Sequence, residues 1–323
     1  HPHQDYGSTV PALEAALARY RGLGMLFPKV VVVQQKENRG FSAGVNTGMS
    51  VALDHGCEYI FLHSHDGFLA PDALRSLVEA MKYDTTIGAA QALMLSYPET
   101  DKVNNEGGIV HYLGFGHISG SGKRWSEVSK DVHDIGYASG GAVMLRADLL
   151  RRFGLWDEDY FLYHEDIEYS MRLRSVGYRI VVVPAAILYH EYEFGRNPKK
   201  WYFMERNRWG LLLTYYKVPT LLLLVPIGLV FECGLLCVAV VQGWWLEKIK
   251  AYGYWCNPFC WQIWLVKRKK IQLQRVVNDR YMLTYVATDA RTPELKSFTS
   301  SFFIISARIL SIYFSLIGKI VRW

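Results

Sequence analysis

Charged residues and cysteines are both scarce in this chain. Only 20% of its 323 residues are charged and 50% are apolar, which excludes general disorder because this apolar fraction can build a packed core. Five cysteines are too few, and odd in number, for the disulfide framework of a secreted protein. The pairs Cys233/Cys237 and Cys256/Cys260 have helical spacing, and their apolar surroundings favour ordinary helix residues over a four-thiolate zinc site. The composition therefore indicates a reducing compartment.

A uniform charge is also absent, although the formal net charge is +6. Residues 1–195 carry 17 Lys and Arg against 24 Asp and Glu, a net charge of −7. Residues 196–323 carry 19 against 6, a net charge of +13. Because these basic residues alternate with long apolar runs, they favour an anionic membrane surface over nucleic acid as the partner. We therefore expect a catalytic domain at 1–207 and a membrane-associated helical region at 208–323.

The front part of the chain alternates between strand and helix patterns. Lys29–Gln34 and Tyr59–Leu62 are short apolar runs typical of buried strands, and Ala43–Asp54 has helical spacing. A further helix is expected from Pro71, and a helix stop followed by a strand at Gly177–Pro184. This rhythm predicts an α/β fold with a mostly parallel, doubly wound sheet, in which ligands bind at the carboxyl ends of the strands.

The back part contains long apolar segments. Val218–Val241 has 24 residues, more than the ~20 that cross a bilayer core, but its two prolines and Glu232 favour a kinked, re-entrant or hairpin helix over a plain span. The basic cluster Lys267–Lys270 suits anionic head groups, and Phe298–Val321 is expected to lie in the membrane interface. The alternative is that both apolar segments are core helices of a soluble domain.

Several motifs contain residues that carry chemistry, although each has a simpler explanation by itself. Residues 38–48 (NRGFSAGVNTG) suit a loop that approaches a ligand closely, or only a tight turn. Asp66 follows an apolar strand, as a metal ligand or a helix cap does. Glu165 and Asp166 begin a helix, where acidic side chains are favoured by the helix dipole alone. His190 by itself is more typical of a structural histidine than of a ligand.

The order and spacing of these segments carry more information than any one of them. They run from DYGST at residues 5–9 and the loop at 38–48 to YFLYHED at 160–166, GYRIVVVPAAILYH at 177–190 and HEYEFGRNPKKWYFMERN at 190–207. In this order they resemble family 2 glycosyltransferases, especially the rhamnosyltransferase-like branch. The resemblance implies a Rossmann-like glycosyltransferase A-type fold. It also implies inverting transfer of a sugar from a nucleotide-sugar donor to a glycan or lipid-linked acceptor.

The resemblance also assigns roles to residues. It implies that Asp166 is the general base that takes the proton of the acceptor hydroxyl. Asp66 and His190 would hold a divalent cation, Mg²⁺ or Mn²⁺, on the donor diphosphate.

Further residues are implied in substrate binding. Those assigned to the nucleotide are Asp5, Asn38, Gly40 and Asn46. Those assigned to the sugar and acceptor region are Gly141, Trp156 and Glu165, and Asp66 reaches the donor through the metal.

Two features of the sequence depart from the family pattern. Ser64 stands where most relatives have Asp or Asn, and a hydroxyl is a poorer ligand for a hard cation than a carboxylate, so either metal affinity is lower or His65 assists. Family members also have a strand and a helix before the segment that resembles residues 5–9. A strand–helix–strand unit needs ~30 residues, so we expect about that much of the sheet to be absent from this sequence.

Other functions fit the sequence less well. A membrane-bound nucleotide-sugar-binding protein without turnover is the main alternative. A zinc hydrolase would use His63, His65 and Asp66 but leaves the later motifs unexplained, and two apolar segments are too few for a channel. The expected partners are donor, acceptor and membrane lipid, without nucleic acid. Positive charge beside the apolar segments predicts attachment at the cytoplasmic face of the cell membrane.

Overall fold

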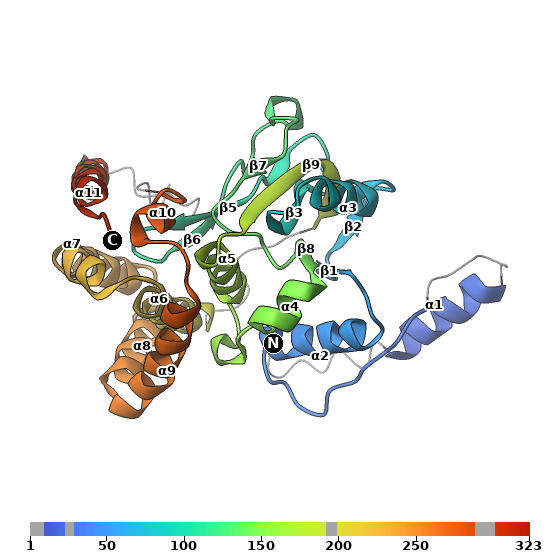
Figure 1. Ribbon diagram of the computed structural model, residues 1–323, viewed down its shortest axis with the longest axis horizontal. Coiled ribbons are helices and arrows are strands. Elements are labelled where there is room, and N and C mark those ends of the chain that lie inside the picture. Colours follow the sequence, from blue (N-terminus) through green and yellow to red (C-terminus); the bar gives the residue numbers. More distant parts are fainter. Residues whose placement is uncertain (1–9, 23–28, 192–198, 288–300) are drawn as a thin grey trace. The chain divides into compact units, whose positions relative to one another are not determined.

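The computed structural model describes residues 10–22, 29–191, 199–287 and 301–323 (Figure 1). The chain divides into two compact units, His1–Asn38 and Arg39–Trp323. The described helix of the first unit is α1 (Val10–Gly22). The predicted domain boundary at residue 207 lies inside a helix of the second unit, and the functional division there remains a prediction.

The strand predicted at Lys29–Gln34 does not form. Residues 29–35 have no regular secondary structure, and the side chains of Val31, Val32 and Val33 are exposed. A β-strand is stable only when its backbone groups pair with a neighbouring strand, and no described strand pairs with this segment. A run of β-branched residues is therefore not sufficient by itself to form a strand.

A seven-stranded sheet forms the centre of the second unit. Its main order is β1-β8-β3-β9-β2, with β4 paired to β3 and β7 paired to β9. The strands are β1 (Tyr59–His63), β2 (Gly67–Leu69), β3 (Ile87–Ser96), β4 (Val103–Asn105), β7 (His133–Asp134), β8 (Ala142–Arg146) and β9 (Arg179–His190).

The α/β class is confirmed, but the expectation of a mostly parallel sheet is wrong. In the described part of the chain, β3 and β9 form the one parallel pair of this sheet, and its other pairs are antiparallel. Strand β8 inserts between β1 and β3 and runs opposite to both. Local periodicity predicts that a strand forms, whereas its direction depends on long-range pairing.

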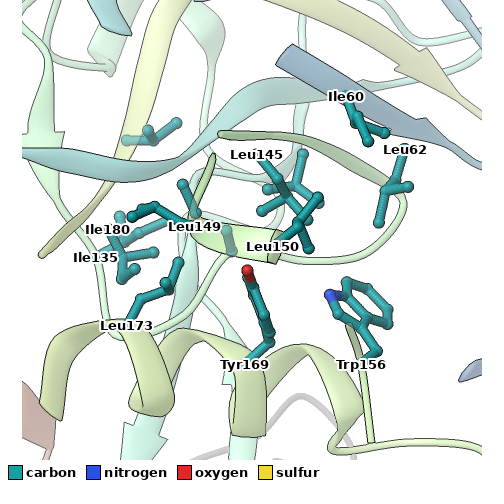
Figure 2. Packing of buried hydrophobic residues seen from close by; sticks show 14 of the residues in the cluster. Ile60, Leu62, Ile135, Leu145, Leu149, Leu150, Trp156, Tyr169, Leu173 and Ile180 are labelled. Atoms are coloured by element: carbon teal, nitrogen blue, oxygen red, sulfur yellow. The ribbon is translucent and has the colours of Figure 1, made fainter. Parts of the chain in front are cut away.

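Helices cover both faces of the sheet. Leu77 and Met81 of α3 are fully buried in one apolar cluster with β3 and β9. On the other face, Tyr169 and Leu173 belong to a second cluster, and Figure 2 shows them pointing from their helix towards the residues of the sheet side. The helices of these two layers are α2 (Phe41–Asp54), α3 (Ala73–Tyr83), α4 (Ala147–Phe153) and α5 (Glu165–Ser175).

The C-terminal part is helical and joins the rest through a small sheet. Strand β10 (Val286–Ala287) pairs with β5 (Gly108–His111), which pairs with β6 (Gly116–Ile118). The helices are α6 (Lys200–Tyr215), α7 (Val218–Val241), α8 (Trp245–Cys256), α9 (Pro258–Gln274), α10 (Asp279–Leu283) and α11 (Ser301–Ile320). Helices α8 and α9 both pack against α6 (Figure 1).

Helix α7 has the bounds predicted for the first apolar segment. Among the described helices it is the one long and apolar enough to cross a membrane, judged by length and composition, and 22% of its most apolar window is buried. Its Glu232 is bound by Arg208 of α6 and by Lys248 of α8, the latter at 2.6 Å. Glu205 completes a buried cluster of two acids and two bases, so the charge of Glu232 is compensated.

Candidate active site

The loop between β1 and β2 holds the first predicted site residues. The hydroxyl of Ser64 donates a hydrogen bond to Oδ1 of Asp66, and the Ser64 backbone N–H donates to the Gly141 carbonyl at 2.9 Å. Ser64 therefore orients the carboxylate of Asp66 and anchors the loop to the segment before β8. These contacts give a structural use to the residue that departs from the family pattern.

His190 lies opposite Asp66 at the end of β9. The antiparallel pairing of Gly67 with His190 sets this position, and His190 Nε2 lies 3.2 Å from Asp66 Oδ1. On its other side, His190 Nδ1 lies 3.1 Å from the side-chain oxygen of Asn104, a residue that the sequence did not single out. The Asp66 side chain is 34% exposed and that of His190 10%, so the pair is reachable from solvent at one side.

This pair suits a divalent cation. When Nδ1 of His190 donates to Asn104, its Nε2 and the Asp66 carboxylate are placed to bind one cation together. Neighbouring ligands of an octahedral Mg²⁺ lie about 3 Å apart, close to the observed separation. In the part of the chain that the structure describes, no group of three or more His, Cys, Asp or Glu is arranged to hold a metal ion, so diphosphate oxygens and water would supply the other ligands.

The charge of Asp66 supports the same function. Partial burial would raise the pKa of its carboxyl, but the Ser64 hydroxyl and the neighbouring His190 outweigh this effect and lower the pKa. Asp66 is therefore ionised at neutral pH, as a metal ligand must be.

Asp166 lies in the first turn of α5. Its Oδ1 accepts from the Ile167 N–H at 2.8 Å and its Oδ2 from the Gly140 N–H at 3.3 Å. Burial raises the pKa of Asp166 to about 6, although these backbone donors oppose the shift. A carboxylate with a pKa near the working pH suits a general base.

Glu165 beside it is buried, with 5% of its surface exposed. Its Oε2 has no hydrogen-bond partner among the described residues. Burial and the neighbouring charge of Asp166 raise the pKa of Glu165 well above its usual value.

The Gly140–Gly141 pair joins the two acidic segments. Gly141 accepts from Ser64 on one side, and Gly140 donates to Asp166 on the other. A Cβ on Gly140 would lie 2.7 Å from the Trp156 ring, so this close packing requires glycine. At Gly141 the nearest atom would be 3.4 Å away, which leaves ordinary space at the predicted substrate-facing residue.

Asn46 and Trp156 connect α2 to the segment before α5 by hydrogen bonds. Asn46 accepts from the Trp156 N–H at 3.0 Å and donates to the Trp156 carbonyl at 2.8 Å and to Glu158 at 3.1 Å. Trp156 is 3% exposed and lies in the core cluster near Tyr169 (Figure 2). The side-chain N–H groups of Asn46 donate within the protein. The predicted contact of Asn46 with a nucleotide remains a prediction. The predicted contact of Trp156 with an acceptor also remains a prediction.

The turn that leads into Glu165 is strained. Phe161, Tyr163 and His164 have φ of 59°, 65° and 70°, which costs on the order of 1–3 kcal/mol for each residue. The Leu162 N–H donates to the Tyr160 carbonyl at 2.6 Å, which closes a γ-turn around Phe161 of the rare positive-φ form. Such strain persists only where the surroundings enforce it.

Gly40 allows one of these enforcing contacts. It has φ of 93°, and a Cβ there would lie 2.5 Å from the Phe161 carbonyl oxygen. The next residue, Phe41, donates its N–H to the same oxygen at 2.7 Å. The predicted nucleotide contact of Gly40 remains a prediction, while its packing role is explained.

The roles of two further residues, Asp5 and Asn38, remain predictions. Asp5 lies outside the described residues. Asn38 is the last residue of the first unit and is exposed.

Three comparisons with known proteins bear on this site. The family model of glycosyl transferase family group 2 matches residues 59–267, which include Asp66, Asp166 and His190. The chain is similar to N-acetylglucosaminyl-diphospho-decaprenol L-rhamnosyltransferase of Mycobacterium tuberculosis, known from two strains. Identity is 26% over 214 residues, which cover 60% of this chain and 67% of that protein.

Among solved structures, GalNAc-T7 with UDP, GalNAc and Mn²⁺ is similar with a TM-score of 0.50. The match has 14% sequence identity, covers 64% of this chain and spans 39% of GalNAc-T7. At this identity the likeness supports the fold alone.

Proposed function

This chain belongs to glycosyl transferase family group 2, and on that premise we propose that it transfers a sugar from a nucleotide-sugar donor to a lipid-linked or glycan acceptor with inversion. The M. tuberculosis relative, which is named for a lipid-linked substrate, supports a lipid-linked acceptor.

In the proposed reaction, Asp166 removes the proton from the acceptor hydroxyl. The acceptor oxygen forms a bond to the anomeric carbon from the face opposite the diphosphate, and the bond between that carbon and the diphosphate breaks. The proton ends on Asp166, and the electron pair leaves with the nucleoside diphosphate. Asp166 is suited to this step because its raised pKa makes the ionised carboxylate a stronger base.

Asp66 and His190 would hold a divalent cation against the donor diphosphate, with Ser64 and Asn104 orienting them. When bound, Mg²⁺ or Mn²⁺ supplies positive charge that stabilises the leaving diphosphate by several kcal/mol. The GalNAc-T7 structure was solved with UDP and Mn²⁺, which agrees with this proposal.

One observation carries the proposal. The Gly141 carbonyl accepts from the Ser64 N–H of the Asp66 loop, and the Gly140 N–H donates to the Asp166 carboxylate, so the glycine pair links the proposed metal ligand and the proposed base. A donor held by its diphosphate beside Asp66 would thus present its sugar towards the region of Asp166.

The test is turnover of a panel of nucleotide sugars by the full natural protein, with lipid-linked acceptors and mass spectrometry of the products. We expect one donor to be consumed with formation of a product heavier by one sugar. Donor binding without turnover of any donor would instead support the nucleotide-sugar-binding protein.

We also propose that α7 and α11 attach the protein to the membrane as interfacial helices. The side chains of Leu222, Val225 and Leu229 lie on one face of α7 and are 66%, 50% and 62% exposed. On α11, Ile309, Ile312 and Leu316 form a similar stripe with 55%, 63% and 52% exposure. An apolar stripe beside a packed inner face is typical of a helix that lies in the interface.

The buried charge cluster favours this orientation over a span. Glu232 of α7 is bound to Arg208 and Lys248, so lipid would not surround this helix on all sides. Tyr313 of α11 donates to the Leu223 carbonyl of α7 at 2.6 Å, which keeps the two helices together.

The basic cluster is smaller than the sequence predicts. Lys267 is paired with Asp157 and Asp159, and Arg268 donates to carbonyls of the α6 end. Lys269 and Lys270 remain exposed and are the residues that we propose to contact anionic lipid on the cytoplasmic face.

A further inference from the structure

Helix α6 carries a side chain that touches the strained turn before the proposed base. Asn207 is fully buried, with 0% of its surface exposed. Its Nδ2 donates to the carbonyls of Tyr160 at 2.9 Å, Leu162 at 3.1 Å and Tyr163 at 2.7 Å. A single amide group thus contacts the backbone on both sides of Phe161.

The rest of the side chain is also fixed. Oδ1 of Asn207 accepts from Nε of Arg206 at 2.8 Å, and the same guanidinium donates to the carbonyls of Asp159 and Tyr160. The amide can therefore not rotate without losing bonds on both of its ends. Two further bonds, from Phe41 to the Phe161 carbonyl and from the His164 ring to the Gly114 carbonyl, hold other parts of the turn.

The turn keeps a strained backbone conformation. Three residues of the five at 160–164 have positive φ, and its γ-turn hydrogen bond is the short-range contact that closes it. Carbonyls in such a turn point away from the usual helix or sheet partners, and Asn207 provides the donors that they need. Asp166 lies two residues after His164, which is the last residue of the turn with positive φ.

We propose that Asn207 is a positioning residue for sugar transfer, which holds the turn at 160–164 so that Asp166 lies where it can take the acceptor proton. This inference rests on the proposed role of Asp166 as base. Asn207 contacts turn carbonyls and Arg206, and it acts on the reaction through the turn.

The test compares Asn207→Ala with Asn207→Gln and Asn207→Asp in the full natural protein. Asn207→Ala should lower kcat by about 100-fold, because a misplacement of ~1 Å at a catalytic group costs that much. The Kd for the nucleotide sugar, measured by calorimetry, should stay within about twofold, since the proposed metal ligands are untouched. Asn207→Gln keeps the donors and should recover part of kcat, whereas Asn207→Asp keeps the shape without the donors and should not.

Leu77→Ala is the matched control. Leu77 is fully buried in α3 on the opposite face of the sheet, so its truncation lowers Tm without touching the turn. We expect it to keep kcat at temperatures well below its Tm. Equal losses of kcat in Leu77→Ala and Asn207→Ala, or wild-type kcat in Asn207→Ala, would overturn the inference.

A second measurement keeps the inference testable if no donor is turned over. Amide hydrogen exchange of residues 160–166 should be faster in Asn207→Ala than in wild type and unchanged in Leu77→Ala. Equal exchange of this turn in wild type and Asn207→Ala would refute the positioning role by itself. Absence of turnover in the wild type would instead count against the proposed function.

Discussion

Asp66 and Asp166 have opposite electrostatic environments within one site. The Ser64 hydroxyl and His190 lower the pKa of Asp66, whereas burial raises the pKa of Asp166 to about 6. One carboxylate is therefore held ionised, as the proposed cation ligand requires, and the other has a pKa that suits the proposed proton transfer. Such a separation of pKa values between two carboxyls is a common basis for assigning different roles.

The raised pKa of Asp166 predicts the pH dependence of turnover. A base works only when ionised, and its ionised fraction falls as the pH drops through its pKa. We expect kcat/KM of the wild type to fall about tenfold per pH unit below pH 6 and to level off above it. An acidic limb near pH 4, the region of an ordinary carboxyl, would contradict the buried environment of this base.

The proposed cation site predicts graded effects of three substitutions. Asp66→Ala should weaken metal-dependent donor binding on the order of 100-fold, because it removes a charged ligand. His190→Ala should be milder, and Asn104→Ala should cost ~10-fold by releasing the orientation of His190. Donor titrations with and without Mn²⁺ measure this series. If EDTA leaves wild-type turnover unchanged, the metal assignment is wrong.

At the scale of elements, the sequence predicts best where the pattern is local. The helix at Val218–Val241 and the strand from Tyr59 follow from their own residues, and both are confirmed. The strand at Lys29–Gln34 and the parallel sheet depended on partners elsewhere in the chain, and these predictions are wrong. Pairing over long distances is not visible in periodicity.

The same limit applies to the site. Asp66, His190 and Asp166 were proposed from motifs, because their segments have characteristic neighbours, and their roles remain predictions. Asn104 contacts His190, 86 positions away, and Asn207 contacts carbonyls 44–47 positions away; these partners are not revealed by any local pattern, although Asn207 ends the motif at 190–207. The partners of Glu232 were missed for the same reason, although its presence in an apolar helix was itself a sign that partners exist.

We expect the membrane attachment to have two parts: apolar burial of α7 and α11, and electrostatic attraction of Lys269 and Lys270 to anionic lipid. In vesicle flotation, the wild type should float with anionic liposomes, resist high salt and be released by detergent. Lys269→Ser with Lys270→Ser should cost roughly 2 kcal/mol, about thirtyfold in binding, and bring it near the level seen with neutral lipid.

The matched control replaces Arg75 and Lys82 of α3 by Ser, which removes the same charge from the catalytic part. This variant should float like the wild type. A wild-type protein that stays at the bottom of the gradient with anionic liposomes would refute membrane attachment and leave a soluble enzyme.

At the scale of the molecule, the candidate site and the two helices that we propose to contact the membrane belong to one unit of the chain, Arg39–Trp323. Helix α6 connects them: Asn207 contacts the turn before Asp166, and Arg208 binds Glu232 of α7. An enzyme that takes a soluble donor and a lipid-linked acceptor needs its base at a fixed place relative to the membrane. Continuity through α6 is consistent with that need.

The central claim is that this chain transfers a sugar with Asp166 as its base, and the single-turnover rate of Asp166→Asn at saturating donor tests it most directly. We predict that Asp166→Asn lowers this rate by roughly 100-fold or more, while donor Kd stays within about twofold and the control Asp148→Asn behaves like the wild type. A wild-type rate in Asp166→Asn, or a loss of donor affinity that accounts for the loss of rate, would contradict it.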